Sequence, residues 1–313
     1  MNLITKLAKE LETSEPNVLS TVASGPLKYK VYSIPKRTRG RRIIAHPSRE
    51  LKQVQKAFLA LYQFPIHSSA MAYKKGVSIK ENAECHRLNK YLLKMDFENF
   101  FNSITPLLFW KVWSLNYPEP TFLEKRVIEN ILFWAPSISE RDNLMLSVGA
   151  PSSPTISNFC LYQFDLIITK YCDDNEITYT RYADDITFSC NTPKGLSKIP
   201  KAVRKTLKNL YGTQIEINNQ KTVFSSQAHN KHVTGITITP DGKLSIGRER
   251  KRYIKHLVHQ YTLGALEQED INHLRGLLSF AKHIEVSFFN SLITKYSADV
   301  MLQITRGNNE KNF

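Results

Sequence analysis

The chain has 313 residues, of which 42% are hydrophobic and 23% charged, so it can bury a sizeable core and is not intrinsically disordered. Its net charge of +15 favours a polyanionic partner, with nucleic acid ahead of a membrane surface. The sequence shows no apolar run long enough to span a bilayer, no signal-peptide core and no Cys-x-x-Cys pair. These features favour a cytoplasmic protein with no membrane partner, zinc site or disulfide framework.

The first predicted elements are two short helices, over residues 3–12 and 17–23, each followed by a proline or glycine break. A hairpin comes next, because apolar and basic residues alternate on both sides of a central glycine. Its cations are Lys28, Lys30, Lys36, Arg37, Arg39, Arg41 and Arg42. Apolar spacing then predicts a helix over 48–62, another over 78–89, and a buried strand over 91–97.

The second half of the chain is predicted to be mostly helical. Helical regions are expected over 106–134 and 153–173, and a basic helix over 199–211. Two short strands are predicted at 213–217 and 233–238. From residue 248 onward the chain is expected to be helical, and it begins with the basic cluster Arg248, Arg250, Lys251, Arg252 and Lys255.

The sequence Tyr182-Ala183-Asp184-Asp185 lies between two segments rich in β-branched and aromatic residues. Such flanks favour strands, which would place the two aspartates at the tight bend of a hairpin. Adjacent carboxylates repel each other unless a cation neutralises them, and Mg²⁺ prefers oxygen ligands. A solvated turn is the alternative, since aspartate is common in turns.

A third carboxylate, Asp96, ends the buried strand predicted over 91–97. If Asp96 faced the Asp184-Asp185 hairpin, the three side chains would form one cluster able to hold two magnesium ions for in-line phosphoryl transfer. The alternative for Asp96 is a helix N-cap. Between these motifs lies a loop of small residues, 149–154, where the backbone could approach a base pair or ribose closely, or simply lead into a helix.

These motifs occur in an order that resembles the palm of a reverse transcriptase: Asp96 with residues 97–101, the loop 149–154, the hairpin 182–185, and then 218–222. Two further segments narrow the family. Asn82-Ala83-Glu84-Cys85-His86 resembles the Asn-Ala-x-x-His signature of bacterial retron reverse transcriptases. Val233-Thr234-Gly235 resembles their Val-Thr-Gly signature.

The resemblance implies an α+β right-hand polymerase. Fingers and palm, with an antiparallel palm sheet and helices, would occupy residues 1–240, and a helical thumb residues 241–313. Asp96, Asp184 and Asp185 would be the catalytic residues that bind Mg²⁺. Phe101 would be the aromatic gate that excludes a nucleotide 2′-hydroxyl, a role compatible with core packing.

The resemblance also assigns residues to the incoming deoxynucleoside triphosphate. Arg41 and Arg42 would grip the triphosphate, since guanidinium geometry suits phosphate oxygens. Val148 and Gly149 would contact the nucleotide; Val148 replaces a glutamine usual in the family, and its side chain cannot form a hydrogen bond. Lys221 would protonate the departing pyrophosphate, or else be an ordinary surface lysine.

RNA-binding residues are expected on two helices. Asn82 and His86 share one helix face and would either contact RNA or form a structural pair. The basic cluster listed above, from Arg248 to Lys255, would contact the phosphates of an RNA or RNA–DNA duplex. A solvated helix face is the alternative for that cluster.

The expected function is RNA-directed DNA synthesis on a dedicated structured noncoding RNA. In the retron family this RNA is both template and primer, priming starts from a 2′-hydroxyl, and the product is RNA-linked single-stranded DNA. The complex would serve in anti-phage defence with an effector protein. One alternative is another bacterial reverse transcriptase, of the intron-encoded or abortive-infection type. A noncatalytic RNA-binding scaffold is the other, and the three intact aspartates argue against it.

Overall fold

The computed structural model describes residues 2–35, 40–140 and 142–306. Lys36, Arg37 and Arg39 of the predicted basic hairpin lie outside these ranges. The chain divides into two compact units, one made of residues 1–76 and 93–223, the other of 77–92 and 224–313. The division into fingers with palm and thumb at residue 240 stays a prediction.

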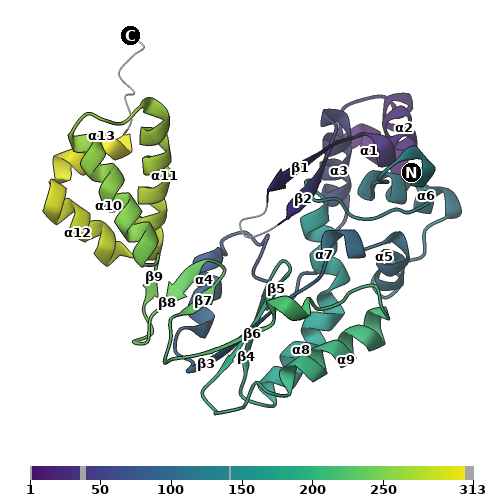
Figure 1. Ribbon diagram of the computed structural model, residues 1–313. Helices are drawn as coiled ribbons and strands as arrows, with labels where there is room; N and C mark the ends of the chain where they lie inside the picture. The colour runs from purple at the N-terminus through teal and green to yellow at the C-terminus, as the bar shows by residue number, and fades with distance from the viewer. Residues whose placement is uncertain (1, 36–39, 141, 307–313) are drawn as a thin grey trace, which may run out of the picture. The chain divides into compact units, whose positions relative to one another are not determined.

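The first unit begins with packed helices and a hairpin (Figure 1). Helices α1 (Leu3–Glu10), α2 (Glu15–Ala23) and α3 (Arg49–Leu61) pack against one another, and α2 and α3 also contact α6 (Phe122–Leu132). Ser48 caps α3 by accepting a hydrogen bond from the Leu51 backbone. Strands β1 (Tyr29–Pro35) and β2 (Arg41–Pro47) pair antiparallel, with Tyr29 opposite Pro47. The predicted hairpin is therefore confirmed.

A four-stranded sheet follows, in the order β4 (Thr178–Tyr182), β5 (Asp185–Cys190), β3 (Tyr91–Asp96) and β6 (Val223–Ser226). Along the chain, β3 leads from the second unit into the first, and β6 leads back. Helix α8 (Tyr162–Asp173) packs against β4 and lies beside α9 (Ile199–Tyr211), as Figure 1 shows. Helices α5 (Pro106–Trp113) and α7 (Ser153–Cys160) contact each other.

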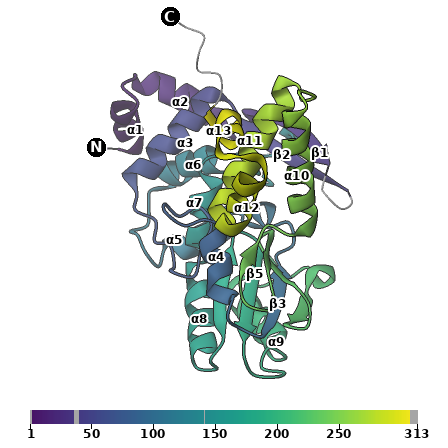
Figure 2. The ribbon, with the colours of Figure 1, turned by 90° about the vertical axis from the view of Figure 1, so that its left-hand side faces the viewer.

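The second unit combines a small sheet with a helical cluster. The sheet has the order β7 (Lys231–Val233), β8 (Ile236–Ile238) and β9 (Leu244–Ser245), and α4 (Ile79–His86) packs on it. Helices α10 (Arg248–Thr262), α11 (Gln268–Ile284), α12 (Val286–Tyr296) and α13 (Ala298–Arg306) pack together (Figure 2). Buried residues such as Val233, Leu257 and Leu278 belong to one shared apolar core.

Two strand predictions were wrong. The strand expected at 213–217 is reduced to a single bridge between Phe97 and Ile217, because the chain leaves α9 through Gly212, which has a left-handed φ of 65°. The strand expected at 233–238 is a hairpin of two strands. Thr234 and Gly235, with φ of 46° and 82°, form its turn, as two-residue hairpin turns require.

The mixture of helices and antiparallel strands confirms the predicted α+β class. None of the helices within the described ranges is long and apolar enough to cross a membrane.

Candidate active site

The predicted Asp-Asp hairpin exists and its bend lies beside the end of β3. Tyr182 pairs with Asp185, so Ala183 and Asp184 form the turn, with Ala183 at a left-handed φ of 57°. The backbone N–H of Phe97 donates to the Asp184 carbonyl at 3.1 Å. Because Phe97 directly follows Asp96, this bond brings the third aspartate to the hairpin bend.

The carboxylates behave as a repulsive group, unlike those of a solvated turn. Desolvation and then the charge of Asp96 raise the pKa of Asp184. Desolvation, followed by the charges of Asp184 and Asp96, raises the pKa of Asp185 to about 6. Asp96 itself is only 6% exposed. Asp96 is thus close enough to both other aspartates to destabilise their charged forms.

Lys221 lies at the same place and is the cation nearest to Asp96. Its Nζ donates to Oδ2 of Asp96 at 2.7 Å. The 3₁₀ turn Asn219–Lys221 is fixed by the Asn218 N–H, which donates to the Asp96 carbonyl at 2.8 Å. Partial desolvation lowers the pKa of Lys221, but the hydrogen bond and charge of Asp96 outweigh it and the pKa is raised. The ammonium form of Lys221 is therefore favoured.

The donor set of this site fits a hard divalent cation. Asp96, Asp184 and Asp185 offer only carboxylate oxygens, the ligand type that Mg²⁺ prefers, and their repulsion is what a cation would relieve. Among the residues that the structure covers, no three His, Cys, Asp or Glu side chains already converge as a metal cluster.

The two predicted triphosphate arginines differ in their surroundings. Arg41 donates from Nε to the Ser33 hydroxyl at 2.7 Å and from Nη2 to the Ser33 carbonyl at 3.0 Å. Desolvation and the charge of Asp96 raise the pKa of Asp184, and the Arg42 charge opposes this increase, so Arg42 lies near that carboxyl group. Both side chains are exposed. Arg42 is the better placed of the two for a triphosphate.

The predicted nucleotide loop lies along β2. The Ala45 N–H donates to the Val148 carbonyl at 3.1 Å. Gly149 has a φ of 129°, and a Cβ there would lie 3.1 Å from the Ala45 carbonyl oxygen, so a side chain would be both strained and crowded. Phe101 is half-buried and its ring packs on Phe100, with centroids 5.2 Å apart. Val148 is also half-buried.

Sequence reasoning missed a fully buried ion pair behind the hairpin. Arg181 Nη2 lies 2.6 Å from Asp165 Oδ2, and both side chains have no exposed surface. Arg181 Nη1 also donates to the Ala183 carbonyl at 3.2 Å and to Asn158 Oδ1 at 3.0 Å. The pair thus holds Ala183, the residue of the Asp-Asp turn with a positive φ. The available signal was Asp165 directly before the apolar run 166–168, and Arg181 within a segment of strand-forming residues.

Tyr73 is a second residue that the sequence did not indicate. The backbone of Arg181 bonds to Ser69 and Met71, which lays the 69–71 segment along β4. Tyr73 follows with a left-handed φ of 62° and is 50% exposed. Desolvation and then the charge of Asp184 raise the pKa of its phenol, so the ring lies near the hairpin.

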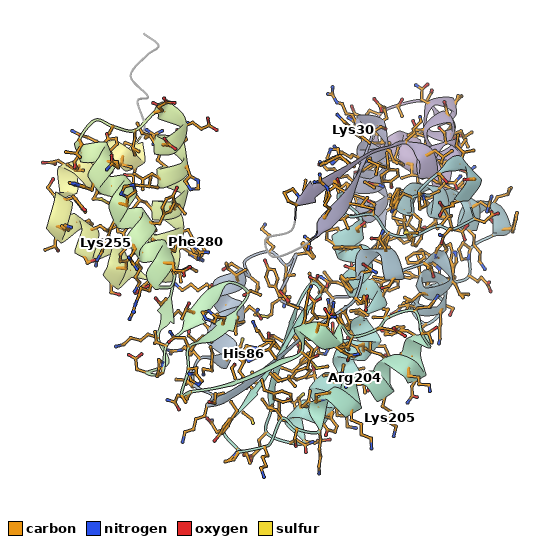
Figure 3. The ribbon with its side chains drawn as sticks, in the orientation of Figure 1. Lys30, His86, Arg204, Lys205, Lys255 and Phe280 are labelled. Carbon is orange, nitrogen blue, oxygen red and sulfur yellow. The ribbon has the colours of Figure 1, made fainter. Side chains whose placement is uncertain are left out.

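The structure places Asn82 and His86 in the interior of the second unit. Both are fully buried, and Asn82 donates to the Thr234 hydroxyl at 3.3 Å, at the turn of the β7–β8 hairpin. Burial, then the charge of Lys231, lowers the pKa of His86 to about 3 (His86 is labelled in Figure 3). The expectation that these side chains contact RNA directly is therefore corrected to the structural alternative, because neither reaches the surface.

The basic cluster on α10 is only partly free. Lys251 forms an ion pair with Glu285 and lies over the Phe288 ring, and Arg250 lies 5.0 Å from the centre of the Phe280 ring. Arg248, Arg252 and Lys255 are exposed. Phe280 and Lys255 are labelled in Figure 3. Lys255 also lies over the Phe288 ring, 5.9 Å from its centre, but it is exposed and forms no ion pair within the described residues, so these three cations can still reach phosphates.

Comparisons with known proteins identify the family of this chain. Residues 34–238 match the family model "Reverse transcriptase (RNA-dependent DNA polymerase)". The retron Ec83 reverse transcriptase of Escherichia coli is 46% identical over 280 residues, which cover 89% of this chain and 90% of that protein. The retron Ec73 reverse transcriptase of Escherichia coli is 32% identical, covering 90% and 91%.

Solved structures give more distant likenesses. A foamy viral protease-reverse transcriptase has a TM-score of 0.46 and 15% identity over 90% of this chain and 44% of its own. Telomerase from Candida albicans has a TM-score of 0.47 and 14% identity over 89% and 61%. This chain spans less than two thirds of either, and scores this low carry no functional argument. The family model and the retron relatives establish the family. The chain belongs to the retron reverse transcriptases and is an RNA-directed DNA polymerase.

Proposed function

We propose that this chain copies a dedicated structured noncoding RNA into single-stranded DNA, with Asp96, Asp184 and Asp185 as the catalytic carboxylates. The observation that carries this proposal is the hydrogen bond between Phe97 and Asp184, which joins the end of β3 to the Asp-Asp turn. Without it the three acidic residues would be separate features of the sequence. Their raised pKa values support the same assignment.

Reverse transcriptases generally use divalent metal ions, and the proposed ion here is Mg²⁺. When bound, two such ions neutralise charge on the attacking and leaving oxygens of phosphoryl transfer. The aspartates would hold them through carboxylate oxygens, and their mutual repulsion would fall as a result. The Arg181–Asp165 pair would keep the turn in place meanwhile, because it bonds the Ala183 carbonyl.

Lys221 and Arg42 would act on the triphosphate of a deoxynucleotide. Lys221 is kept protonated by its acidic neighbours, which suits donation of a proton to the departing pyrophosphate oxygen. The exposed guanidinium of Arg42 can form paired hydrogen bonds with phosphate oxygens. Phe101 would exclude a ribose 2′-hydroxyl by its bulk. Val148 would pack against the nucleotide without a side-chain hydrogen bond.

The RNA partner is proposed from the retron relatives. The resemblance to retron reverse transcriptases implies an RNA that is both template and primer, so we propose priming from an RNA 2′-hydroxyl and an RNA-linked DNA product. The exposed α10 cations Arg248, Arg252 and Lys255 would contact its phosphates. A role in anti-phage defence with an effector protein rests on the family resemblance alone.

The experiment is to purify the protein from its native host context and analyse the nucleic acid that co-purifies. An Asp184→Ala, Asp185→Ala variant is purified in parallel. The expected result is a branched species sensitive to both RNase and DNase, present with the native chain and missing with the variant. RNA alone in both samples would favour the noncatalytic scaffold instead and contradict the proposal.

A further inference from the structure

Helix α9 carries a row of exposed cations on the side that faces away from its packing partners. Its apolar side, with Ile199, Val203 and Leu207, is buried, and the Tyr211 hydroxyl donates to the Cys160 carbonyl at 2.9 Å. The opposite side is the α9 basic face, which we define as Lys198, Lys201, Arg204, Lys205 and Lys208, all exposed. Arg204 and Lys205 are labelled on this helix in Figure 3.

Nothing in the described part of the chain neutralises this face. Helix α9 contains no aspartate or glutamate, and none of the five cations forms an ion pair within the described residues. The one side-chain bond is from Arg204 Nη2 to Asn219 Oδ1, at 2.6 Å. On α10, by contrast, Lys251 is paired with Glu285.

The arrangement is unfavourable for the helix by itself. Lys201 and Lys205 are four residues apart, as are Arg204 and Lys208, and like charges at this spacing destabilise a helix. Cations in the first turn also oppose the helix dipole. An external polyanion would relieve both effects. Over ten residues the face extends about 15 Å, enough to meet several phosphates.

We propose that the α9 basic face binds the phosphate backbone of a double-helical stem of the RNA that this polymerase copies. The inference rests on the proposed structured RNA and adds a contact surface outside the active site. Duplex RNA is recognised mainly through its shape, 2′-hydroxyls and phosphates, which a row of lysines and arginines can satisfy.

The composition of the α9 basic face favours duplex RNA over single-stranded nucleic acid, a protein partner or a lipid surface. Single-stranded nucleic acid is usually held by aromatic stacking, and the face offers no aromatic side chain. A protein partner would need an apolar centre to desolvate, and every member of the face is charged. An amphipathic helix that lies in a lipid surface inserts its apolar side, and that side of α9 is buried within the first unit.

The test variant replaces Lys201, Lys205 and Lys208 with glutamine in the full chain. Arg204 is left intact because it bonds Asn219 in the turn that carries Lys221. The matched control makes the same change in net charge at exposed lysines elsewhere in the first unit, Lys6, Lys9 and Lys56. A variant with arginine at the three α9 positions preserves the charge.

The probe is a blunt RNA hairpin with a stem of about 20 base pairs and no primer overhang, titrated from about 50 to about 200 mM salt. We expect the glutamine variant to bind at least about tenfold more weakly and to lose about two to three units of salt slope. The control and the arginine variant should bind like the native chain. Extension of a DNA primer on a short unstructured RNA template should be unchanged in all four proteins.

Unchanged hairpin affinity in the glutamine variant would overturn the inference. An equal loss in the control would also overturn it, because net charge would then be the cause. Equal loss of binding to a single-stranded RNA of the same length would overturn the choice of a duplex. Failure of the proposed function is distinguishable, since it would appear as absent primer extension in the native chain.

Discussion

Asp165 and the pair Asp184-Asp185 lie close to the same hairpin, but they differ in whether a cation neutralises them. Asp165 is fully buried but has its cation, Arg181, at 2.6 Å and a further hydrogen bond from the Tyr179 hydroxyl at 2.7 Å. Asp184 and Asp185 form no ion pair with any lysine or arginine in the described ranges, and both have raised pKa values. A buried carboxylate paired with a cation contributes to a stable fold. Unpaired carboxylates that repel one another instead favour the binding of an external cation, which would reduce the repulsion.

The largest expected effect comes from neutralising one unsatisfied carboxylate. Asp184→Asn should lower the rate of primer extension on an RNA template by at least about a thousandfold, because a proposed metal ligand is lost. Its free energy of unfolding should stay the same or increase, since one source of repulsion disappears. Extension kinetics measure the expected loss of rate, and urea unfolding measures the expected change in stability. Activity of Asp184→Asn within tenfold of the native chain would contradict the proposed role of Asp184 as a metal ligand.

Neutralising the satisfied pair should do the reverse. Arg181→Met leaves Asp165 buried without its cation and should reduce the free energy of unfolding by about 3–5 kcal/mol. The control Tyr179→Phe removes only one hydrogen bond to the same carboxylate and should cost about 1.5–3 kcal/mol. Urea unfolding monitored by fluorescence measures both. Equal stability of Arg181→Met and the native chain would mean that the pair does not hold the hairpin.

Lys221 is intermediate between the two cases, since it forms an ion pair with Asp96, one of the proposed catalytic carboxylates. Lys221→Met should lower kcat by about a hundredfold, with a smaller change in KM, if it supplies a proton to pyrophosphate. Lys125→Met is the matched control, because Lys125 also pairs with a carboxylate, Glu119, at 2.6 Å in the same unit. Steady-state extension kinetics distinguish them. A small effect of the same size in both variants would identify Lys221 as an ordinary surface lysine.

His86 is a third kind of buried titratable group, because it stays neutral in the folded chain. Its pKa falls from 6.5 to about 3 on folding, so protonation is easier in the unfolded chain. The contribution of His86 to the free energy of unfolding is therefore fully present above pH 6.5 and is lost as the pH falls toward 3. At pH 5 the free energy of unfolding should be lower by about 2 kcal/mol. Hydrogen exchange at α4 in the native chain and in His86→Gln measures this. A pH dependence that survives the substitution would contradict the assignment.

The sequence predicted best those features that depend on neighbouring residues. The basic helix 199–211 matches α9, and the strand ending at Asp96 matches β3, because periodic apolar residues define both locally. The bend at Asp184 was predicted from its β-rich flanks in the same way. The nearness of Asp96 to that bend was a hypothesis from its place at a strand end, which the resemblance to a known palm supported, since the two segments are far apart in the chain.

Other features could not be predicted because they depend on tertiary partners. Arg181 and Asp165 lie 16 residues apart on different elements, and only the packing of α8 on β4 makes them a pair. The strand predicted over 233–238 is a hairpin because Thr234 adopts a positive φ, which is unusual for a β-branched residue. Its partner Asn82 lies far away in sequence, on α4, so the burial of Asn82 and His86 had no local signal.

The central claim is that Asp96, Asp184 and Asp185 together hold the divalent ions of DNA synthesis. The most direct test is a calorimetric titration of Mn²⁺, as a substitute for Mg²⁺, into the native chain and into Asp184→Asn, with Arg181→Lys as a control for the turn. The claim predicts binding to the native chain and an affinity at least about tenfold lower in Asp184→Asn. Equal Mn²⁺ affinity in the native chain and Asp184→Asn would contradict it.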